Sequence, residues 1–166
     1  MTRGFTLIEV LVMLIIMGAL TAGVAPQYRQ IVEKNEMKGF ANDLYSFFAQ
    51  SRSEAVFRNR DLYCFFKRSG NRNDEWTLSL HLEDLATSDT ISQLSGKSYK
   101  RLFVNSNFTN DRFKVGGVTG KVQQNGNFEF GLSENDLKGL KLVAHSVTGR
   151  IRLCGVSQNG YGYDKC

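Results

Sequence analysis

Two arginines near the end of the sequence have the spacing of a phosphate-binding pair. Gly149 precedes Arg150, and Ile151 separates Arg150 from Arg152. Side chains two residues apart on an extended strand point the same way and lie about 6.6 Å apart. A guanidinium group can donate a fork of hydrogen bonds to phosphate oxygens, and successive phosphates of one DNA strand have a comparable spacing. We therefore expect Arg150 and Arg152 to face one surface, with Ile151 inward and Gly149 permitting the preceding turn.

The same arginines have a second interpretation. Charged side chains on an edge strand commonly stay solvated and block pairing with another chain. The net charge does not separate the two interpretations. The chain has 21 Lys and Arg against 16 Asp and Glu, a formal charge of +5, and from Arg29 onward 20 against 15, which is again +5. Such a mild basic bias permits an anionic partner without requiring one.

Three cysteines limit the covalent chemistry of the chain. They are Cys64, Cys154 and Cys166, and no C-x-x-C pair occurs, so a zinc site is poorly supported. Outside the cytoplasm a disulfide is expected. A Cys154–Cys166 bond would close a loop of about a dozen residues, worth on the order of 3 kcal/mol in the chain-entropy model, and would bring Lys165 back as a third cation. Pairing of Cys64 with Cys154 is the alternative.

The sequence contains no recognisable catalytic grouping. Asp74 and Glu75 are adjacent, so a strand would point them to opposite faces and make them a poor acid–base pair. His81 and His145 have no evident nucleophile partner, and no P-loop or dinucleotide-binding motif occurs. We expect a protein that is not an enzyme and that needs no metal or other cofactor.

Glu9 is the only charge in an apolar run from Phe5 to Val24. A run of about 20 residues can cross a bilayer as a helix, and a carboxylate inside it calls for a partner. A secretory signal peptide is an alternative, and the segment 19–22 could pass as its late cleavage site. However, the run is longer than most such peptides have, and its basic start is only Thr2-Arg3.

The elements that carry these residues follow from hydrophobic periodicity. Beyond Pro26, apolar residues recur at three- and four-residue steps, which predicts a continuous helix from Phe5 to about Arg58 that Pro26 can kink without ending. Period-two patterns then predict strands. These cover 62–66, 76–80, 101–105, 113–118, 140–146 and 150–156, together with a hairpin over 120–131 that turns at Asn125-Gly126. The polar stretch 86–98 is predicted to be loop.

The opening Gly4-Phe5-Thr6-Leu7-Ile8-Glu9 resembles the processing motif of type IV pilins and type II secretion pseudopilins. The resemblance implies that a prepilin peptidase cleaves between Gly4 and Phe5 and that Phe5 is N-methylated. It also implies a partner for Glu9, the terminal amine of a neighbouring subunit, as the apolar helices bundle into a filament. A buried carboxylate is tolerable once it is paired.

Further along, the chain resembles the GspH/FimT family of minor pilins. Two segments carry this resemblance. Ala49-Gln50-Ser51-Arg52-Ser53-Glu54-Ala55 is similar to the family's A-R-S-E-A region, and Gly149-Arg150-Ile151-Arg152 is similar to the G-R-x-R signature of FimT-type pilins. FimT-type pilins bind DNA during natural transformation. The resemblance implies an α+β fold in which a long N-terminal helix, its first half membrane-spanning, packs on an antiparallel β-sheet head. It also implies double-stranded DNA binding by Gly149, Arg150 and Arg152, to which Lys165 adds a further charge if a Cys154–Cys166 disulfide folds the tail back.

The expected organisation has three parts: a leader over 1–4, a membrane and filament-core segment over 5–28, and a head over 29–166. We expect a single-pass protein of the bacterial inner membrane with its head in the periplasm, which later reaches the pilus and cell surface. Its expected partners are other major and minor pilins, prepilin peptidase, the inner membrane and DNA. The alternative function is a purely structural minor pilin or the pseudopilin H of a type II secretion system, acting in filament initiation or assembly.

Overall fold

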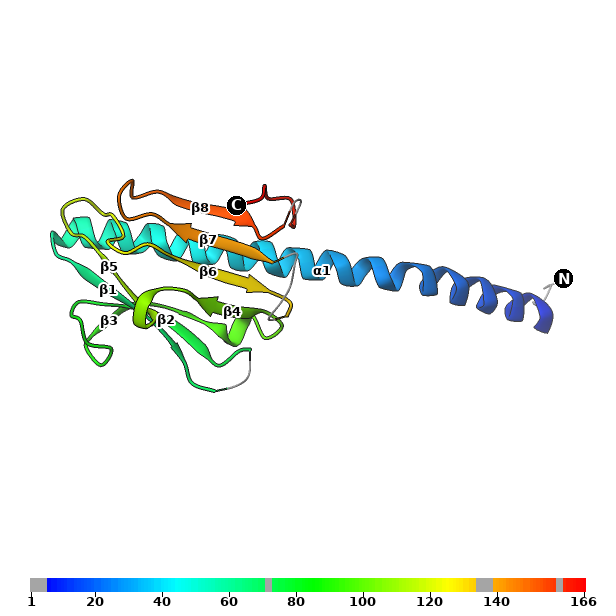
Figure 1. The fold of residues 1–166 in the computed structure, drawn as a ribbon. Helices are drawn as coiled ribbons and strands as arrows, with labels where there is room; N and C mark the ends of the chain where they lie inside the picture. Colours follow the sequence, from blue (N-terminus) through cyan, green and yellow to red (C-terminus); the bar gives the residue numbers. More distant parts are fainter. Residues whose placement is uncertain (1–5, 71–72, 134–138, 158–159) are drawn as a thin grey trace. The chain divides into compact units, whose positions relative to one another are not determined.

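The computed structural model (Figure 1) describes residues 6–70, 73–133, 139–157 and 160–166, without the side chains of residues 23–26. The chain divides into two compact units, residues 1–36 and residues 37–166, and each is described by itself. One helix, α1 (Leu7–Arg58), contributes to both units, as the sequence predicts. Gly4 and Phe5, the predicted processing residues, lie outside the described residues.

The first unit consists of the apolar half of α1. Its large side chains point outward around the whole helix, and those of Leu7 to Met17 are all roughly half exposed or more. Glu9 lies in the first helical turn and is exposed. This helix is long and apolar enough to cross a membrane, judged by length and composition. An apolar surface of this kind is stable in lipid or against other apolar helices, and not in water.

In the second unit, residues 37–166, which we call the head from here on, one side of α1 is buried. The buried residues recur at helical spacing: Met37, Phe40, Ala41, Leu44, Phe47, Phe48, Ser51 and Ala55. The polar member, Ser51, donates its hydroxyl to the Phe47 carbonyl over 2.7 Å and so enters the core with its hydrogen bond satisfied. The helix ends at Arg58 because Asn59 adopts a positive φ of 49°, a left-handed conformation that closes many helices.

Two four-stranded antiparallel sheets pack with this buried side of α1 into one hydrophobic core. The first has the order β3-β2-β1-β5, and the second has the order β4-β6-β7-β8. Their bounds are β1 Leu62–Arg68, β2 Trp76–His81, β3 Thr90–Ser95, β4 Phe103–Ser106, β5 Arg112–Val115, β6 Gly126–Gly131, β7 Leu140–Ala144 and β8 Ile151–Gly155. Figure 1 shows β6 and β7 running along the head portion of α1.

Aromatic rings fill the space between the helix and the two sheets. Phe48 of α1 stacks on Phe113 of β5 with ring centroids 4.8 Å apart, and it meets Phe128 of β6 edge-on at 6.0 Å. Phe40 contacts Trp76 of β2 and Phe130 of β6 in the same edge-on manner. Such pairs add about 0.5–1.5 kcal/mol each beyond the area that they bury. One helical side therefore joins both sheets.

The prediction of loop over 86–98 is wrong for its middle part, because Thr90–Ser95 forms β3. This strand lies at the edge of the first sheet and pairs with β2, for example Leu78 with Leu94. Its side chains are exposed or half-buried, so its sequence is rich in Ser, Thr and Gln and lacks a clear apolar period. Pairing with β2, which is not visible in the local sequence, makes it a strand.

The predicted hairpin over 120–131 is also wrong. The turn comes earlier, around Gly120, whose φ is +62°, and the Gly120 amide donates to the Gly116 carbonyl. Val122 then bridges back to Val115 at the end of β5. Gly126 is the first residue of β6, not a turn residue. Asn125, expected in the turn, instead accepts hydrogen bonds from another loop, as described below.

Candidate nucleic-acid interface

The two candidate arginines lie at the start of an edge strand. β8 is the last strand of the second sheet and pairs on one side with β7, where Arg152 lies opposite Val143. Arg150 comes directly before β8, and both arginines are exposed. Ile151 between them is half-buried and packs on the core. The alternation predicted from the sequence, with arginines outward and Ile151 inward, is therefore present.

The turn before β8 is fixed by Gly149. Its φ is +66°, and its amide donates to the His145 carbonyl over 2.9 Å while the His145 amide donates to Arg150 over 3.0 Å. A Cβ at Gly149 would come within 2.7 Å of the Lys121 side chain. Glycine is thus required here both by the positive φ and by the close approach of a neighbouring loop.

A disulfide between Cys154 and Cys166 holds the tail beside β8. Gly155 donates to the Asp164 carbonyl, and the Cys166 amide donates to Gly155, so the tail pairs with the end of this edge strand. Lys165 is thereby brought next to Arg152, whose Nη2 lies 3.4 Å from the Lys165 carbonyl oxygen. The four candidate residues of the sequence analysis thus lie along one strand edge.

Lys121 is a neighbouring cation that the sequence analysis did not select. It lies in the loop between β5 and β6, packs against Gly149, and donates from Nζ to the Val147 carbonyl over 3.1 Å. Asn125 supports the same turn, because its side-chain oxygen accepts hydrogen bonds from both the amide and the hydroxyl of Ser146. Both residues act across a long sequence separation: Lys121 belongs to no motif, and the Asn125-Gly126 pair indicates a local turn and not this contact.

The loop that carries Lys121 is itself fixed by Asp61. The Asp61 carboxylate accepts from Lys114 Nζ and from the Gly117 amide, each over 2.9 Å. The Lys114 hydrogen bond and then the Gly117 amide lower the pKa of Asp61, and the same carboxylate raises the pKa of Lys114. Gly117 packs directly on the backbone of Arg60, where a Cβ would clash. A chain of contacts therefore runs from the end of α1 to the β7–β8 turn.

The remaining cysteine and one of the two histidines lie in surroundings that suit a structural role. Cys64 is a buried free thiol 4.0 Å from the Ser51 hydroxyl, and burial raises the pKa of the thiol, which keeps it protonated and unreactive. His81 is buried, with Nε2 2.8 Å from the Ser79 hydroxyl and Nδ1 2.9 Å from the Ser88 carbonyl. Among the described residues no His, Cys, Asp or Glu cluster could hold a metal ion.

The head matches a known family model. The model, described as type II transport protein GspH, matches residues 41–163. The chain belongs to the GspH family. The match begins in the head portion of α1 and runs beyond β8, so this GspH-family region includes all of the described strands and the two candidate arginines.

Solved structures give the same fold for this GspH-family chain. It is similar to the type IV minor pilin FimU of Pseudomonas aeruginosa strain PAO1 in two crystal forms. In space group P21 the TM-score is 0.56 at 20% identity, covering 77% of this chain and 95% of that chain. In P65 the TM-score is 0.56 at 19% identity, covering 74% and 95%. The expected pilin-like α+β fold is thus confirmed. No curated protein sequence matches the chain.

Proposed function

We propose that this GspH-family chain is a minor pilin that binds extracellular double-stranded DNA for uptake in natural transformation. The observation that carries the proposal is the outward pair Arg150 and Arg152 at the start of an edge strand, with the tail residue Lys165 held next to Arg152 by a disulfide. It is supported by the resemblance of Gly149-Arg150-Ile151-Arg152 to the signature of FimT-type pilins.

Binding of this kind depends on phosphate contacts, which carry affinity but no sequence information. Two or three neutralised phosphates give a logarithmic salt dependence with a slope of about −2 to −3. The affinity is therefore modest at physiological salt and rises steeply at low salt. Sequence tolerance suits a protein that captures DNA of any origin.

The apolar half of α1 supplies the filament role. Prepilin peptidase cleaves between Gly4 and Phe5, the helix anchors the chain in the inner membrane with the head in the periplasm, and assembly with other pilins moves the head to the cell surface. Glu9 pairs with the terminal amine of a neighbouring subunit. A carboxylate placed among apolar side chains is otherwise unstable, which is the physical support for this pairing.

The arginine pair is tested on the mature full-length protein in detergent with a DNA gel shift across a salt series. We expect Arg150→Gln with Arg152→Gln to weaken binding about tenfold at low salt and to reduce the salt slope by about 2. The matched control is Lys97→Gln with Lys100→Gln, which removes the same charge from exposed positions after β3 of the other sheet. Equal affinity of the arginine variant and the control would refute DNA binding at β8.

A second candidate function is supported by the family description, type II transport protein GspH. Here the chain is a structural minor pilin or pseudopilin H, and its arginines only protect the edge strand. The Glu9→Ala variant separates filament assembly from DNA capture, because it changes assembly without touching β8. Normal filament assembly by the arginine variant, together with lost DNA uptake, favours the first function; unchanged uptake favours the second.

A further inference from the structure

The most exposed apolar side chains of the head lie on segments at the same end of the head as the β7–β8 turn. Among the described residues of the head, three large apolar side chains are more than four-fifths exposed: Phe57 at 87%, Val118 at 85% and Val147 at 83%. They come from the last turn of α1, the loop after β5 and the β7–β8 turn. Figure 1 shows these three segments at the same end of the head.

The backbones of two of these residues lie close to Lys121. Val118 lies in the same loop as Lys121, and Val147 offers its carbonyl to Lys121 Nζ. The loop also packs on α1, because Gly120 lies against the Val56 side chain. Val118 and Val147 are therefore carried by two loops that Lys121 joins, and Arg150 follows Val147 by three residues.

The backbone around Val147 is rigid. Hydrogen bonds fix the turn before and after this residue, through His145, Ser146, Gly149 and the Lys121 contact. A hydrophobic side chain presented on an ordered turn loses little conformational entropy when it binds. Single exposed apolar residues are ordinary, but two on adjoining loops with cations between and beside them form a surface of mixed chemistry.

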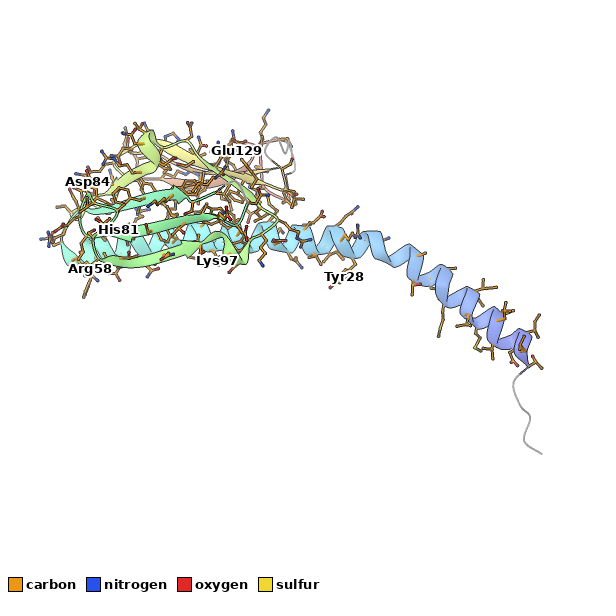
Figure 2. The ribbon with its side chains drawn as sticks, turned by 90° about the horizontal axis from the view of Figure 1, so that it is seen from below. Tyr28, Arg58, His81, Asp84, Lys97 and Glu129 are labelled. Atoms are coloured by element: carbon orange, nitrogen blue, oxygen red, sulfur yellow. A yellow bond between two sulfur atoms is a disulfide. The ribbon has the colours of Figure 1, made fainter. Side chains whose placement is uncertain are left out.

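The opposite side of this end of the head is acidic. The loop 82–89 joins β2 to β3 and carries Glu83, Asp84 and Asp89, all exposed, together with an exposed Leu85. Figure 2 shows Asp84 near the end of α1 that is marked by Arg58. Arg112 pairs with Asp84, but Glu83 and Asp89 leave this loop with an excess of acids, whereas the loops that carry the two valines hold Lys121 and no acid.

We propose that Val118 and Val147 cover the exposed base-pair face of a duplex end while Arg150 and Arg152 bind the flanking phosphates. A duplex end offers a flat apolar face bordered by anions, which matches apolar tips bordered by cations. An uninterrupted duplex offers only phosphates, and exposing its bases requires a few kcal/mol of unstacking per step. This proposal rests on the proposed DNA binding and adds a preference for DNA ends.

An anionic membrane is the other surface that combines charge with an apolar interior. Segments that insert into the membrane interface typically present Trp, Phe or Leu on a broad apolar face. The two loops present valines, which are short, and their cations continue along β8 in a line. The observations therefore favour DNA, and the membrane is tested as a competing outcome.

The experiment is a competition assay with the mature full-length protein in detergent. A labelled blunt-ended duplex is displaced by equal masses of two unlabelled competitors, a short blunt-ended duplex and a covalently closed relaxed circle. We expect the short duplex to compete about fivefold better than the circle, the effect of burying part of two valine side chains. Equal competition by the two DNAs overturns the proposal.

The valines are tested by Val118→Ser with Val147→Ser. Both side chains lie outside the core, so the disulfide and the thermal unfolding midpoint should not change. The competition ratio should fall to about one while binding to the closed circle stays the same. Leu85→Ser is the matched control, because it removes an exposed apolar side chain from the acidic loop at the same end and should leave the ratio at its original value.

Two further arms distinguish this proposal from the proposed function. If Arg150→Gln with Arg152→Gln loses binding to both DNAs but the valine variant keeps the preference for ends, only the end-binding proposal fails. If the arginine variant binds both DNAs normally, the proposed function itself fails. A valine variant that loses binding to vesicles of anionic phospholipid, but keeps its preference for DNA ends, assigns the valines to a membrane and also overturns the proposal.

Discussion

The two units of the chain differ in how far they bury their apolar side chains. The helical unit up to residue 36 exposes almost all of them, whereas the head buries a continuous core between α1 and two sheets. Polar groups differ as well: Ser51 of the head is buried with its hydrogen bond satisfied, whereas Glu9 is an exposed carboxylate on an apolar helix. The head is therefore a self-sufficient domain, while the first unit depends on surroundings that other molecules provide.

The largest expected effect tests whether the head core alone sets stability. Phe48→Ala removes a ring that contacts Phe113 and Phe128 and should lower the free energy of unfolding by about 3–5 kcal/mol. Leu14→Ala, a change of an exposed apolar residue in the first unit, should leave the unfolding of the head unchanged. Chemical denaturation of the mature protein in detergent measures both, and a comparable loss in the two variants would refute the division.

The disulfide is a second difference between the two units, because the head has a covalent cross-link and the first unit contains no cysteine. Cys166→Ser opens a loop of sequence separation 12 and should cost about 3 kcal/mol in the chain-entropy model. It also releases the tail from β8, so Lys165 no longer lies beside Arg152. Thermal unfolding measures the loss. An equal midpoint for wild type and variant, both checked for their number of free thiols by mass, would contradict this prediction.

Gly149→Ala tests how strictly the cation-bearing turn is defined. The added methyl group meets the Lys121 side chain, and the positive φ is unfavourable for alanine, so we expect a loss of about 1–2 kcal/mol. Gly39→Ala on α1, where a Cβ would meet no atom within 4 Å, is the control and should be neutral or slightly stabilising. Denaturant unfolding compares the two; identical stability would show that the turn tolerates other conformations.

The smallest effect concerns Asp61, and it depends on pH. Because the pKa of Asp61 is lowered in the folded state, its pairing stabilises the fold at any pH above the ordinary carboxyl pKa. This stabilisation is lost as the pH falls through the pKa of the folded state. Because the pKa of Lys114 is raised in the folded state, the stabilisation by this pair is fully present at any pH below the ordinary lysine pKa. It is lost as the pH rises through the pKa of the folded state. Water still reaches both side chains, which are 41% (Asp61) and 27% (Lys114) exposed and so screened, and Asp61→Asn should cost only about 0.5–1 kcal/mol near neutrality.

The measurement for Asp61 is unfolding free energy against pH for wild type and variant. The difference should shrink as the pH falls from about 4, where the Asp61 carboxyl of the unfolded chain begins to bind a proton, through the lower pKa of the folded state. Asp84→Asn, which breaks a pair with Arg112 on the surface but no backbone contact, should have a smaller effect. A constant difference across the acid range would assign the effect of Asp61→Asn to something other than its charge.

The sequence predicted the elements whose burial is regular. The side of α1 from Met37 to Ala55 has a helical period because one side meets the core, and β1 and β2 alternate because one face of their sheet is buried. Edge strand β3 escaped prediction because neither of its faces is buried. The turn predicted at Asn125-Gly126 is wrong for a different reason. The Asn125 side chain accepts a hydrogen bond from Ser146, in a loop that is distant in sequence.

The candidate site was predictable where its residues are consecutive or, for Lys165, joined by the expected disulfide. Gly149, Arg150 and Arg152 share one turn and one strand, so their spacing carries geometric information. Lys121, by contrast, reaches the site through the turn at Gly120 and the packing of that loop on α1, which depend on the tertiary fold. The exposure of Val118 and Val147 likewise cannot be read from two ordinary valines in the sequence.

The position of the cysteines bears on how the head matures. Cys154 and Cys166 both follow the first seven strands, whereas Cys64 is on β1 and faces Ser51 of the helix. The short separation of 12 residues favours closure of the Cys154–Cys166 loop over a long-range pairing, and the folded head keeps the third thiol, Cys64, away from solvent by burying it.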